Sequence, residues 1–343
     1  MSISDEHRFG LSTCWNGGRH GSNPAALLDE HERLGFRRLE AYSLHTPTQL
    51  AELAAAARER GFEITSLHAP CPIAVNEQGF RARWGDWLAS TNQVDRQHAV
   101  DTVKRTIDAA NEYGARGIVI HLGTTAAPSR HHALVNATTQ QGRNSPAHLE
   151  LVEQSIRERA ASAQAHLEAA LLSIRALGEH AVGSSVRLGV EARDQYQEVP
   201  SLDEMGTVLD ACAGLPVGYW HDAGHGAKLE YFGFLEHEEY LRRYADRMIG
   251  MHVHDTQGAR DHRAPGQGGT DFTMLAKYVK PDTILTLELH PDVLAEHITP
   301  GVEWLVSLGM GAAEGAAPAY WTVQPPSTIS EAPVMNAEAS ETR

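Results

Sequence analysis

Short apolar runs alternate with longer amphipathic segments along most of the chain. The runs are rich in Val, Ile, Leu and aromatic residues and are bounded by Gly, Pro or Asp. Continuous apolar runs of this length are typical of strands that are buried on both faces, as in a parallel sheet. The pattern therefore predicts strands at 9–14, 38–42, 64–68, 117–121, 186–191, 217–222, 249–254 and 283–288.

The intervening segments carry apolar residues three and four positions apart, which is the spacing of one helix face. This spacing predicts helices at 24–34, 47–60, 94–113, 149–180, 201–213, 235–246, 272–279 and 302–308. Ser201 followed by Glu204 has the form of a capping box at the start of one of them. Strands that alternate with helices in this way predict an α/β fold, a (β/α)8 TIM barrel. An open doubly wound sheet is the alternative, although no G-x-G-x-x-G motif follows the first strand.

Two predicted loops are much longer than the usual length of about four to six residues. One spans 71–92 and contains Trp84 and Trp87, and the other spans 123–148 and contains His131 and His132. They follow the third and fourth strands, so in a barrel they lie on the catalytic face as lids or substrate walls, or else are plain surface insertions. Trp84 and Trp87 also offer a surface to a neighbouring subunit, which would make the protein a homo-oligomer.

A single barrel domain is expected over residues 8–310. From 311 to 343 the composition shifts to Gly, Ala, Pro, Ser and Glu. Such a segment is typical of a loosely ordered tail, and Tyr320 and Trp321 would anchor it.

The chain of 343 residues has 29 Lys and Arg against 44 Asp and Glu, a formal net charge of −15. This balance lacks the broad basic surface of a nucleic-acid-binding protein and disfavours such a partner. No apolar stretch is long enough to cross a membrane. The cysteines Cys14, Cys71 and Cys212 form no C-x-x-C pair, and the first residues carry no secretory signal, so we expect a cytoplasmic protein.

The 20 histidines are unusual, and several stand where a barrel carries its chemistry. Catalytic side chains of (β/α)8 barrels lie at the carboxyl ends of the strands. Six successive predicted strands end in or beside such groups: His68, His121, Glu191, Asp222 with His225, His252 with His254, and Glu288. Crowded carboxylates and imidazoles are unfavourable unless a divalent cation compensates them, so these residues predict a metal site. A donor set without thiolate suits Mn²⁺ or Zn²⁺, with Co²⁺ and Fe²⁺ as further choices, better than Ca²⁺.

Glu191 and Glu288 are the hardest of these residues to explain structurally, because an unpaired carboxylate in an apolar strand is costly to bury. His254 shares a strand face with His252, so it would be a ligand, a neighbour of the ligands or a core residue. His221 should face the opposite side of its strand. Histidines away from the strand ends, such as His31 and His237, are expected on solvated helix surfaces.

The order Glu191, Asp222-x-x-His225, His252 and Glu288 resembles the xylose isomerase-like barrel superfamily. That superfamily includes sugar and sugar-phosphate isomerases and epimerases, and also the endonuclease IV enzymes. The resemblance covers roughly residues 8–308. Its most specific stretches are YWHDAGH at 219–225, MHVHD at 251–255, DHRAPGQG at 261–268 and LELHP at 287–291.

The resemblance implies a divalent cation held by Glu191, Asp222, His252 and Glu288. In the epimerases, the two glutamates also move a proton, one removing it beside a metal-polarised carbonyl and the other returning it on the opposite face. His225 would bind substrate oxygens near the metal. The implied activity is an isomerase or epimerase that acts on a small polyhydroxylated sugar, sugar phosphate or polyol through a metal-stabilised enediolate.

One departure from the epimerase pattern keeps other activities open, and one departure from the endonuclease IV pattern argues against a third metal. His262 stands where those epimerases carry a substrate-binding Arg, and together with His68, His121 and His225 it matches ligand positions of the endonuclease IV zinc cluster. Arg260 stands where that cluster has an Asp. These four histidines would therefore be second-metal ligands or substrate contacts.

The alternative activities are an endonuclease IV-like zinc phosphodiesterase, which is a hydrolase, and a lyase or dehydratase that uses the same site. Arg193 and His254 are weaker candidates for substrate binding. Arg193 and Lys228 would supply positive charge to an anionic substrate, although a surface ion pair is the favoured role of Lys228.

Overall fold

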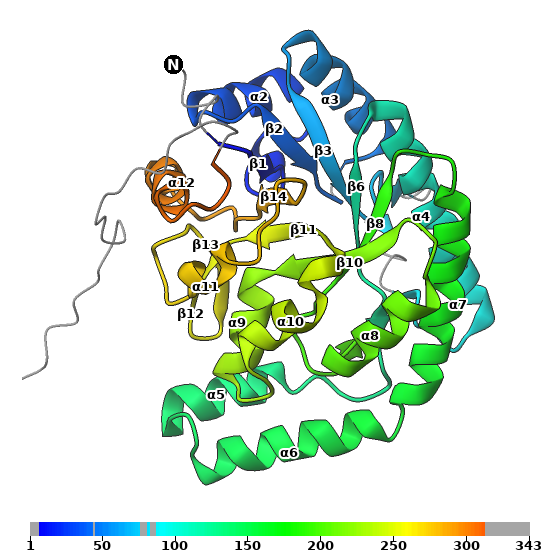
Figure 1. Ribbon diagram of the computed structural model, residues 1–343, viewed down its shortest axis with the longest axis vertical. Helices are drawn as coiled ribbons and strands as arrows, with labels where there is room; N and C mark the ends of the chain where they lie inside the picture. Colours follow the sequence, from blue (N-terminus) through cyan, green and yellow to red (C-terminus); the bar gives the residue numbers. More distant parts are fainter. Residues whose placement is uncertain (1–6, 44, 76–80, 83–86, 313–343) are drawn as a thin grey trace, which may run out of the picture.

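Eight parallel strands close into a barrel in the computed structural model, which describes residues 7–43, 45–75, 81–82 and 87–312 (Figure 1). Around the barrel the strands follow the order β1, β2, β3, β6, β8, β10, β11 and β14, and β14 pairs with β1. The closed sheet confirms the predicted (β/α)8 fold and excludes the open doubly wound alternative. The strands are β1 Phe9–Ser12, β2 Arg38–Ala41, β3 Glu63–His68, β6 Gly117–Ile120, β8 Arg187–Glu191, β10 Val217–Asp222, β11 Met248–Val253 and β14 Ile284–Leu287.

Helices surround the barrel and connect its strands (Figure 1). Ser201 and Glu204 form the predicted capping box of α8, and Thr46 and Gln49 form another at α3. The helices that correspond to predicted segments are α2 Pro24–Arg33, α3 Pro47–Glu59, α4 Gln93–Tyr113, α7 Ala163–Ala181, α8 Leu202–Ala211, α10 His237–Tyr244, α11 Phe272–Ala276 and α12 Ile298–Ser307. Two 3-10 helices, η3 Ala245–Arg247 and η4 Ala295–His297, precede β11 and α12.

The predicted helix at 149–180 is wrong, because two helices occupy this part of the chain. They are α6 (Pro146–Ala160) and α7, and α6 runs beside α5 at the bottom of Figure 1 while α7 packs along α4. No Gly or Pro marks the break between them. Arg159, at the end of α6, is buried and donates to Glu204 in α8 at 2.9 Å. Helical periodicity therefore does not reveal the break.

Among the described residues, three more helices lie outside the predicted ones. The loop expected at 123–148 contains α5 (His131–Gln141) and the start of α6, while α1 (Gly17–His20) follows β1 and α9 (Ala223–Tyr231) follows β10. Asp222 caps α9 by accepting the His225 backbone N–H at 2.7 Å. A candidate metal ligand thus also begins a helix.

Short two-stranded antiparallel sheets lie in the connections that follow the barrel strands. They are β4 (Ala74–Val75) with β5 (Arg81–Ala82), β7 (Gly123–Thr124) with β9 (Glu198–Val199), and β12 (Asp255–Gln257) with β13 (Arg260–Arg263). Trp84 of the loop at 71–92 lies outside the described residues. Trp87 is 45% exposed.

A tryptophan fills the lower interior of the barrel. Trp220 is fully buried and packs with Val119, Ile249 and Ile284. Only glycine fits opposite its ring, because a Cβ on Gly250 would lie 2.1 Å from Trp220 Cζ3. The edge of the ring reaches His252, with centroids 5.2 Å apart. The Trp220 ring therefore forms the apolar surface against which the polar site packs.

The end of the described chain is tied to its beginning. The Arg8 backbone N–H donates to the Gly311 carbonyl at 2.8 Å, and His7 and Ala312 form an antiparallel bridge. Residues 311 and 312 thus belong to the folded body, although the loose tail was expected to begin at 311. Residues 313–343, including Tyr320 and Trp321, lie outside the described part of the chain.

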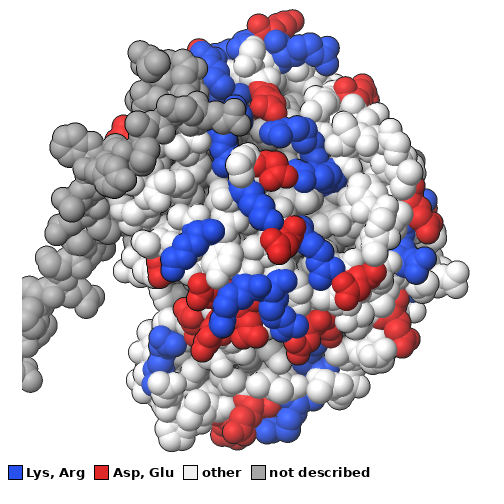
Figure 2. Space-filling model, in the orientation of Figure 1, with Lys and Arg blue, Asp and Glu red and all other residues white. Residues whose placement is uncertain are grey.

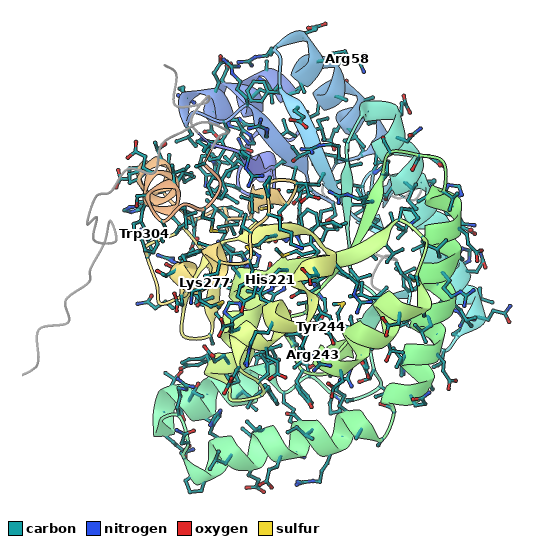
Figure 3. All side chains as sticks on the ribbon, in the orientation of Figure 1. Arg58, His221, Arg243, Tyr244, Lys277 and Trp304 are labelled. Atoms are coloured by element: carbon teal, nitrogen blue, oxygen red, sulfur yellow. The ribbon has the colours of Figure 1, made fainter. Side chains whose placement is uncertain are left out.

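On the face shown in Figure 2, basic side chains lie among acidic ones. Polar contacts also join neighbouring helices: Arg243 at the end of α10 pairs with Asp203 in α8 at 2.7 Å, and the next residue, Tyr244, donates to the Leu202 carbonyl at 2.6 Å (Figure 3). None of the described helices combines the length and apolar character needed to span a membrane.

Candidate metal centre

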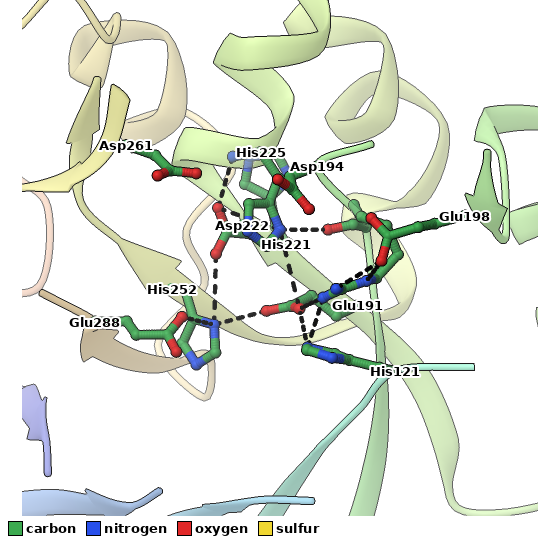
Figure 4. A network of polar contacts seen from close by, with 12 residues as sticks. His121, Glu191, Asp194, Glu198, His221, Asp222, His225, His252, Asp261 and Glu288 are labelled. Carbon is green, nitrogen blue, oxygen red and sulfur yellow. Dashed lines mark hydrogen bonds and ion pairs between the residues drawn. The ribbon is translucent and has the colours of Figure 1, made fainter. Parts of the chain in front are cut away.

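Four of the side chains predicted at the strand ends meet at one point. Glu191 ends β8, Asp222 ends β10, His252 lies near the end of β11, and Glu288 directly follows β14. One nitrogen or oxygen of each lies within 4.8 Å of the others, and all four residues are buried (Figure 4). The sheet register explains this convergence, since Trp220 pairs with Glu191 and Asp222 pairs with His252 on adjacent strands.

The His252 imidazole lies at the centre of this group. Its Nδ1 lies 2.7 Å from Glu191 Oε1, 2.9 Å from Glu288 Oε2 and 3.5 Å from Asp222 Oδ2. On the other side of the ring, Nε2 lies 3.1 Å from Glu40 Oε2. Glu40 belongs to β2 and is absent from the predicted site.

The charges of this group stabilise one another. Burial alone raises the pKa of Glu191, but His121 and His252 more than offset that and hold it well below its usual value. Burial opposes ionisation of Asp222 and Glu288 too, yet neighbouring histidines hold the pKa of each carboxyl well below the usual range. Burial lowers the pKa of His252, whereas Glu288 and Glu40 raise it well above the ordinary value. The carboxylates are therefore ionised at neutral pH.

The donor set fits a divalent cation. Three ionised carboxylates and one imidazole nitrogen converge where their side chains are at most 6% exposed. Hard oxygen donors with a single imidazole and no thiolate suit Mn²⁺ and also accept Zn²⁺ or Co²⁺. The residues present thus agree with the kind of metal that the sequence predicts.

His68 and His121 form a second group that shares Glu191. His121 Nε2 lies 2.7 Å from Glu191 Oε2, and the His68 and His121 rings meet edge to face with centroids 4.6 Å apart. Nitrogen and oxygen atoms of these three residues also lie within 4.8 Å of one another. Arg193 Nη1 lies 2.8 Å from the same Glu191 oxygen and 2.6 Å from His121 Nε2.

His225 and His262 both line the cavity described below, and their ring centroids lie 6.0 Å apart. His225 Nδ1 donates to the Ala192 carbonyl at 2.9 Å, which leaves Nε2 as its free ring nitrogen to bind a ligand. His262 Nδ1 lies 3.1 Å from Asp261 Oδ1, and its Nε2 lies 3.5 Å from Glu288 Oε2. His262 has a φ of 55°, a left-handed conformation that is costly for a residue with a side chain and is found most often at functional sites.

His254 lies behind Asp222 instead of in the cavity. It is fully buried, its Nε2 lies 2.9 Å from Asp222 Oδ1, and its Nδ1 accepts the His262 backbone N–H at 2.9 Å. Because both ring nitrogens are engaged by the protein, His254 orients Asp222 and the hairpin that carries His262. Nitrogen and oxygen atoms of His254, Asp222, His262 and Glu288 also lie within 4.8 Å of one another, and a contact of His254 with substrate stays a prediction.

A cavity of about 310 Å³ opens over these groups. Its lining includes Glu191, Glu288 and all four histidines expected to be second-metal ligands or substrate contacts: His68, His121, His225 and His262. The lining also includes Tyr42 and Asp194, which the sequence does not single out.

Lys228 also lines this cavity, which corrects its expected place in a surface ion pair. The residue is 4% exposed, and its Nζ lies 2.7 Å from both Asp194 Oδ2 and Asp261 Oδ2. Burial lowers the pKa of Lys228, but the two aspartates raise it above its usual value. Arg193 is held in a similar way, by Glu198 Oε1 at 2.8 Å as well as by Glu191.

His221 faces away from the site, as its position in the strand predicts. Its Nδ1 lies 2.7 Å from the Tyr219 hydroxyl and its Nε2 lies 3.0 Å from His237 Nε2. Figure 3 labels His221 within the structure. His237 and His31 are buried, so the expectation that both are solvated is wrong.

Comparison with known proteins agrees with this architecture. A family model described as xylose isomerase-like TIM barrel matches residues 28–308. A curated relative, the uncharacterized protein y4fM of Sinorhizobium fredii, is 24% identical over 236 residues, which make up 64% of this chain. The match spans 63% of that relative, less than two thirds of its length.

Several solved structures share the fold. They include 3-keto-D-glucoside 4-epimerase from E. coli in its apo form, with a TM-score of 0.61 and 16% identity over 88% of this chain and 99% of that one. D-psicose 3-epimerase from Clostridium cellulolyticum with D-tagatose has a TM-score of 0.61 and 11% identity, with the same coverage of 88% and 99%. D-allulose 3-epimerase from Methylomonas sp. with D-allulose has a TM-score of 0.56 and 14% identity, over 90% and 91%. At such identities the likeness shows the fold alone.

Proposed function

Because the chain belongs to the xylose isomerase-like TIM barrel family, we propose that it is a sugar isomerase or epimerase that depends on a divalent cation. The observation that carries this proposal is the convergence of Glu191, Asp222, His252 and Glu288 beside the cavity, with ligand atoms within 4.8 Å of one another. The titles of similarly folded structures, which name epimerases of 3-keto-glucoside, psicose and allulose, support the reaction class.

These four residues would hold the cation, with Mn²⁺ or Zn²⁺ as the leading choices and Co²⁺ as a substitute. When bound, the cation would supply Lewis-acid polarisation of carbonyl and hydroxyl oxygens on the substrate. The residues themselves bring three negative charges to a buried place, where a cation is stabilised far more than it is in water.

Glu191 and Glu288 would move the proton. Both line the cavity and both are ionised at neutral pH, so either carboxylate can accept a proton from a carbon beside a carbonyl. The other carboxyl would return a proton to the opposite face of the flat intermediate, and configuration would invert. Each glutamate has a histidine beside it, His121 at 2.7 Å and His262 at 3.5 Å, that orients the carboxylate.

The cavity favours a small, uncharged polyhydroxylated substrate. Its volume of about 310 Å³ lies at the lower end of the range for ligand sites, about 300–1,000 Å³. Arg193 and Lys228 both line it, and each is engaged by two carboxylates at 2.7–3.0 Å. An added phosphate would have to compete with those carboxylates, so a free sugar or polyol is favoured over a phosphorylated one. His225 and His262 would donate or accept hydrogen bonds at its hydroxyls.

Solvent exchange tests the proposal. The protein is stripped with a chelator, reloaded with Mn²⁺ and incubated in D₂O with a panel of ketoses and polyols. We expect deuterium to enter the carbon beside the carbonyl, and Glu288→Gln should slow its entry by about 10²–10⁴-fold. The matched control is Glu158→Gln. It removes a carboxylate that pairs with Arg130 and does not line the cavity, so the variant should exchange like wild type. Absence of exchange across the panel would contradict the proposal.

A second candidate is a zinc-dependent phosphodiesterase, a hydrolase of the endonuclease IV kind. The observation that favours it is the group of His68, His121 and Glu191, which is able to hold a second metal next to the first. Metal analysis separates the two activities. One cation per chain supports the isomerase, whereas two or three Zn²⁺ per chain with cleavage of abasic DNA support the hydrolase.

A lyase or dehydratase would use the same proton removal and differ in expelling a leaving group. The mass of the product distinguishes these outcomes in the D₂O experiment, because isomers keep the mass of the substrate apart from deuterium. A product lighter by one water would identify a dehydratase.

We also propose a cytoplasmic, homo-oligomeric enzyme. The free thiols of Cys14, Cys71 and Cys212 support a reducing compartment, and the exposed Trp87 offers an apolar contact to a second copy. Light scattering coupled to gel filtration measures the oligomeric state directly.

A further inference from the structure

Glu40 is a buried carboxylate in the wall of the barrel that none of the roles above uses. It lies on β2 between Leu39 and Ala41, and all three residues are 0% exposed. Glu40 Oε2 accepts the Ser66 hydroxyl at 2.8 Å and lies 3.1 Å from His252 Nε2. Its other oxygen, Oε1, is buried with no hydrogen-bond partner among the described residues.

Stability alone does not account for this residue. A fully buried carboxylate with one unsatisfied oxygen is destabilising compared with an apolar side chain of similar size. The residues that pair with Glu40 on the neighbouring strands, Ser12 on β1 and Ser66 on β3, are small and uncharged. The role of Glu40 therefore has to be sought in what its carboxyl group contacts.

That role is visible in the orientation of the His252 ring. Both ring nitrogens face carboxyl oxygens, Nε2 that of Glu40 at 3.1 Å and Nδ1 those of Glu191 and Glu288 at 2.7 and 2.9 Å. A cation among Glu191, Asp222 and Glu288 would take the place of a proton on Nδ1, and the ring would keep the N–H on Nε2 that it donates to Glu40. Two rings fix the plane: His68 stacks parallel at 5.9 Å, with an interplanar angle of 2°, and the Trp220 edge approaches at 5.2 Å.

We propose that Glu40 is a positioning residue of the metal centre, which holds the His252 imidazole with Nδ1 directed at the cation and makes that nitrogen a stronger donor. The inference rests on the proposed function, because it assumes that His252 is a ligand. Carboxylates that accept the second N–H of a ligating histidine typically contribute about 10–100-fold to metal affinity. Ser66 in turn orients Glu40, so β2, β3 and β11 each supply one member of the chain Ser66–Glu40–His252.

The test measures metal binding rather than turnover. Chelator-stripped wild type and Glu40→Gln are titrated with Mn²⁺ by calorimetry and with Co²⁺ by visible absorption, which reports the ligand field. We expect Glu40→Gln to bind Mn²⁺ about 10–100-fold more weakly and to show a changed Co²⁺ spectrum. Glu204→Gln is the matched control, because Glu204 is a carboxylate that is only 13% exposed and pairs with Arg159 away from the site. It should lose stability without a change in either readout.

The outcomes are distinguishable. If wild type binds Mn²⁺ and Glu40→Gln matches it in affinity and spectrum, the inference about Glu40 is overturned while the proposed function stands. If wild type binds no cation, the proposed function itself fails. Should Glu40→Gln not fold, Ser66→Ala takes its place: a several-fold weaker Mn²⁺ affinity supports the inference, and unchanged affinity overturns it.

Discussion

Glu191 joins two groups of side chains through its two oxygens. Oε1 contacts His252 in the four-residue centre, and Oε2 contacts His121 and Arg193 on the other side. A change at this residue therefore affects both places where a cation would bind. Asp222 also makes several contacts at once: it faces His252, caps α9, and accepts a hydrogen bond from His254.

Lys228 is a residue whose partners make it sensitive to substitution. Lys228→Met leaves Asp194 and Asp261 facing each other without the ammonium between them. We expect a loss of about 3–5 kcal/mol in the free energy of unfolding, measured by urea titration, because removing one partner strands a buried charge.

The control for this change is Lys280→Met. Lys280 pairs with Asp246 at 2.9 Å, but both side chains are exposed, so its removal should hardly alter the urea midpoint. Equal effects of the two substitutions would show that the Lys228 pairs do not stabilise the fold.

His31 predicts a pH dependence of stability. Burial lowers its pKa from 6.5 to about 3, whereas in the unfolded chain the imidazole binds a proton below about pH 6.5. The unfolded state therefore holds more protons between these values, and stability falls as the pH drops through that window, by about 1.4 kcal/mol per pH unit for this residue.

The substitution His31→Gln tests this dependence, since the amide can still donate to Asn16 Oδ1 as His31 Nε2 does at 3.3 Å. Unfolding free energies measured between pH 6 and pH 4, about where the difference is largest, should fall less steeply in the variant. Parallel curves for the two proteins would contradict the assignment.

At the scale of elements, the loop at 255–270 shows how one carboxylate organises a segment. Asp255 is 1% exposed and accepts four backbone N–H groups, from Thr256, Gly266, Gly268 and Thr270, at 2.8–3.0 Å. This loop carries His262 and Asp261 to the cavity. Its shape therefore decides whether those two side chains reach Glu288 and Lys228.

Two adjacent glycines in this loop provide a matched pair of substitutions. A Cβ on Gly268 would lie 2.1 Å from the Thr256 carbonyl oxygen, whereas Gly269 has no atom within 4 Å of its Cβ position. Gly268→Ala should cost about 1–3 kcal/mol of unfolding free energy, and Gly269→Ala should lie within about 0.5 kcal/mol of wild type. Chemical denaturation of both variants measures the difference, and equal stabilities would rule out this close approach.

The strands and their end residues are the part that the sequence predicts best. Parallel strands buried on both faces leave a clear apolar signal, and barrel geometry then brings their carboxyl ends together. Glu191, Asp222, His252 and Glu288 are therefore brought together as expected. Glu40 is missed because it lies inside its strand instead of at the end, although the argument that singles out Glu288, a carboxylate in an apolar strand, applies to it equally.

Other features depend on contacts between distant segments. Arg159 at the end of α6 contacts Glu204 in α8, and Lys228 lies on α9, the helix that Asp222 caps. The burial of His31 and His237 depends on Asn16 and His221, which lie elsewhere in the chain. Periodicity describes a segment alone, so it does not anticipate these pairings.

At the scale of the whole molecule, the closed barrel supports a concentration of buried charge at one rim. Trp220 and its apolar neighbours close the interior below His252, and the cavity opens above it. Bound metal would thus stabilise the entire fold, because the ligands come from β8, β10 and β11 and from the residue after β14.

Removal of metal should consequently lower the melting temperature. A ligand at about 100 times its Kd stabilises the folded state by about 2.7 kcal/mol, so Mn²⁺-loaded protein should melt several degrees above chelated protein. Differential scanning calorimetry measures the shift. Asp222→Asn should show a much smaller response to Mn²⁺, and a full response in that variant would place the cation elsewhere.

The proposed function requires one divalent cation among Glu191, Asp222, His252 and Glu288. Anomalous diffraction from crystals of the Mn²⁺-loaded protein locates such a cation. We expect an anomalous peak in contact with oxygens of the three carboxylates and with His252 Nδ1. A crystal grown with saturating Mn²⁺ that shows no peak there, or a peak only at another site, would contradict the proposed function.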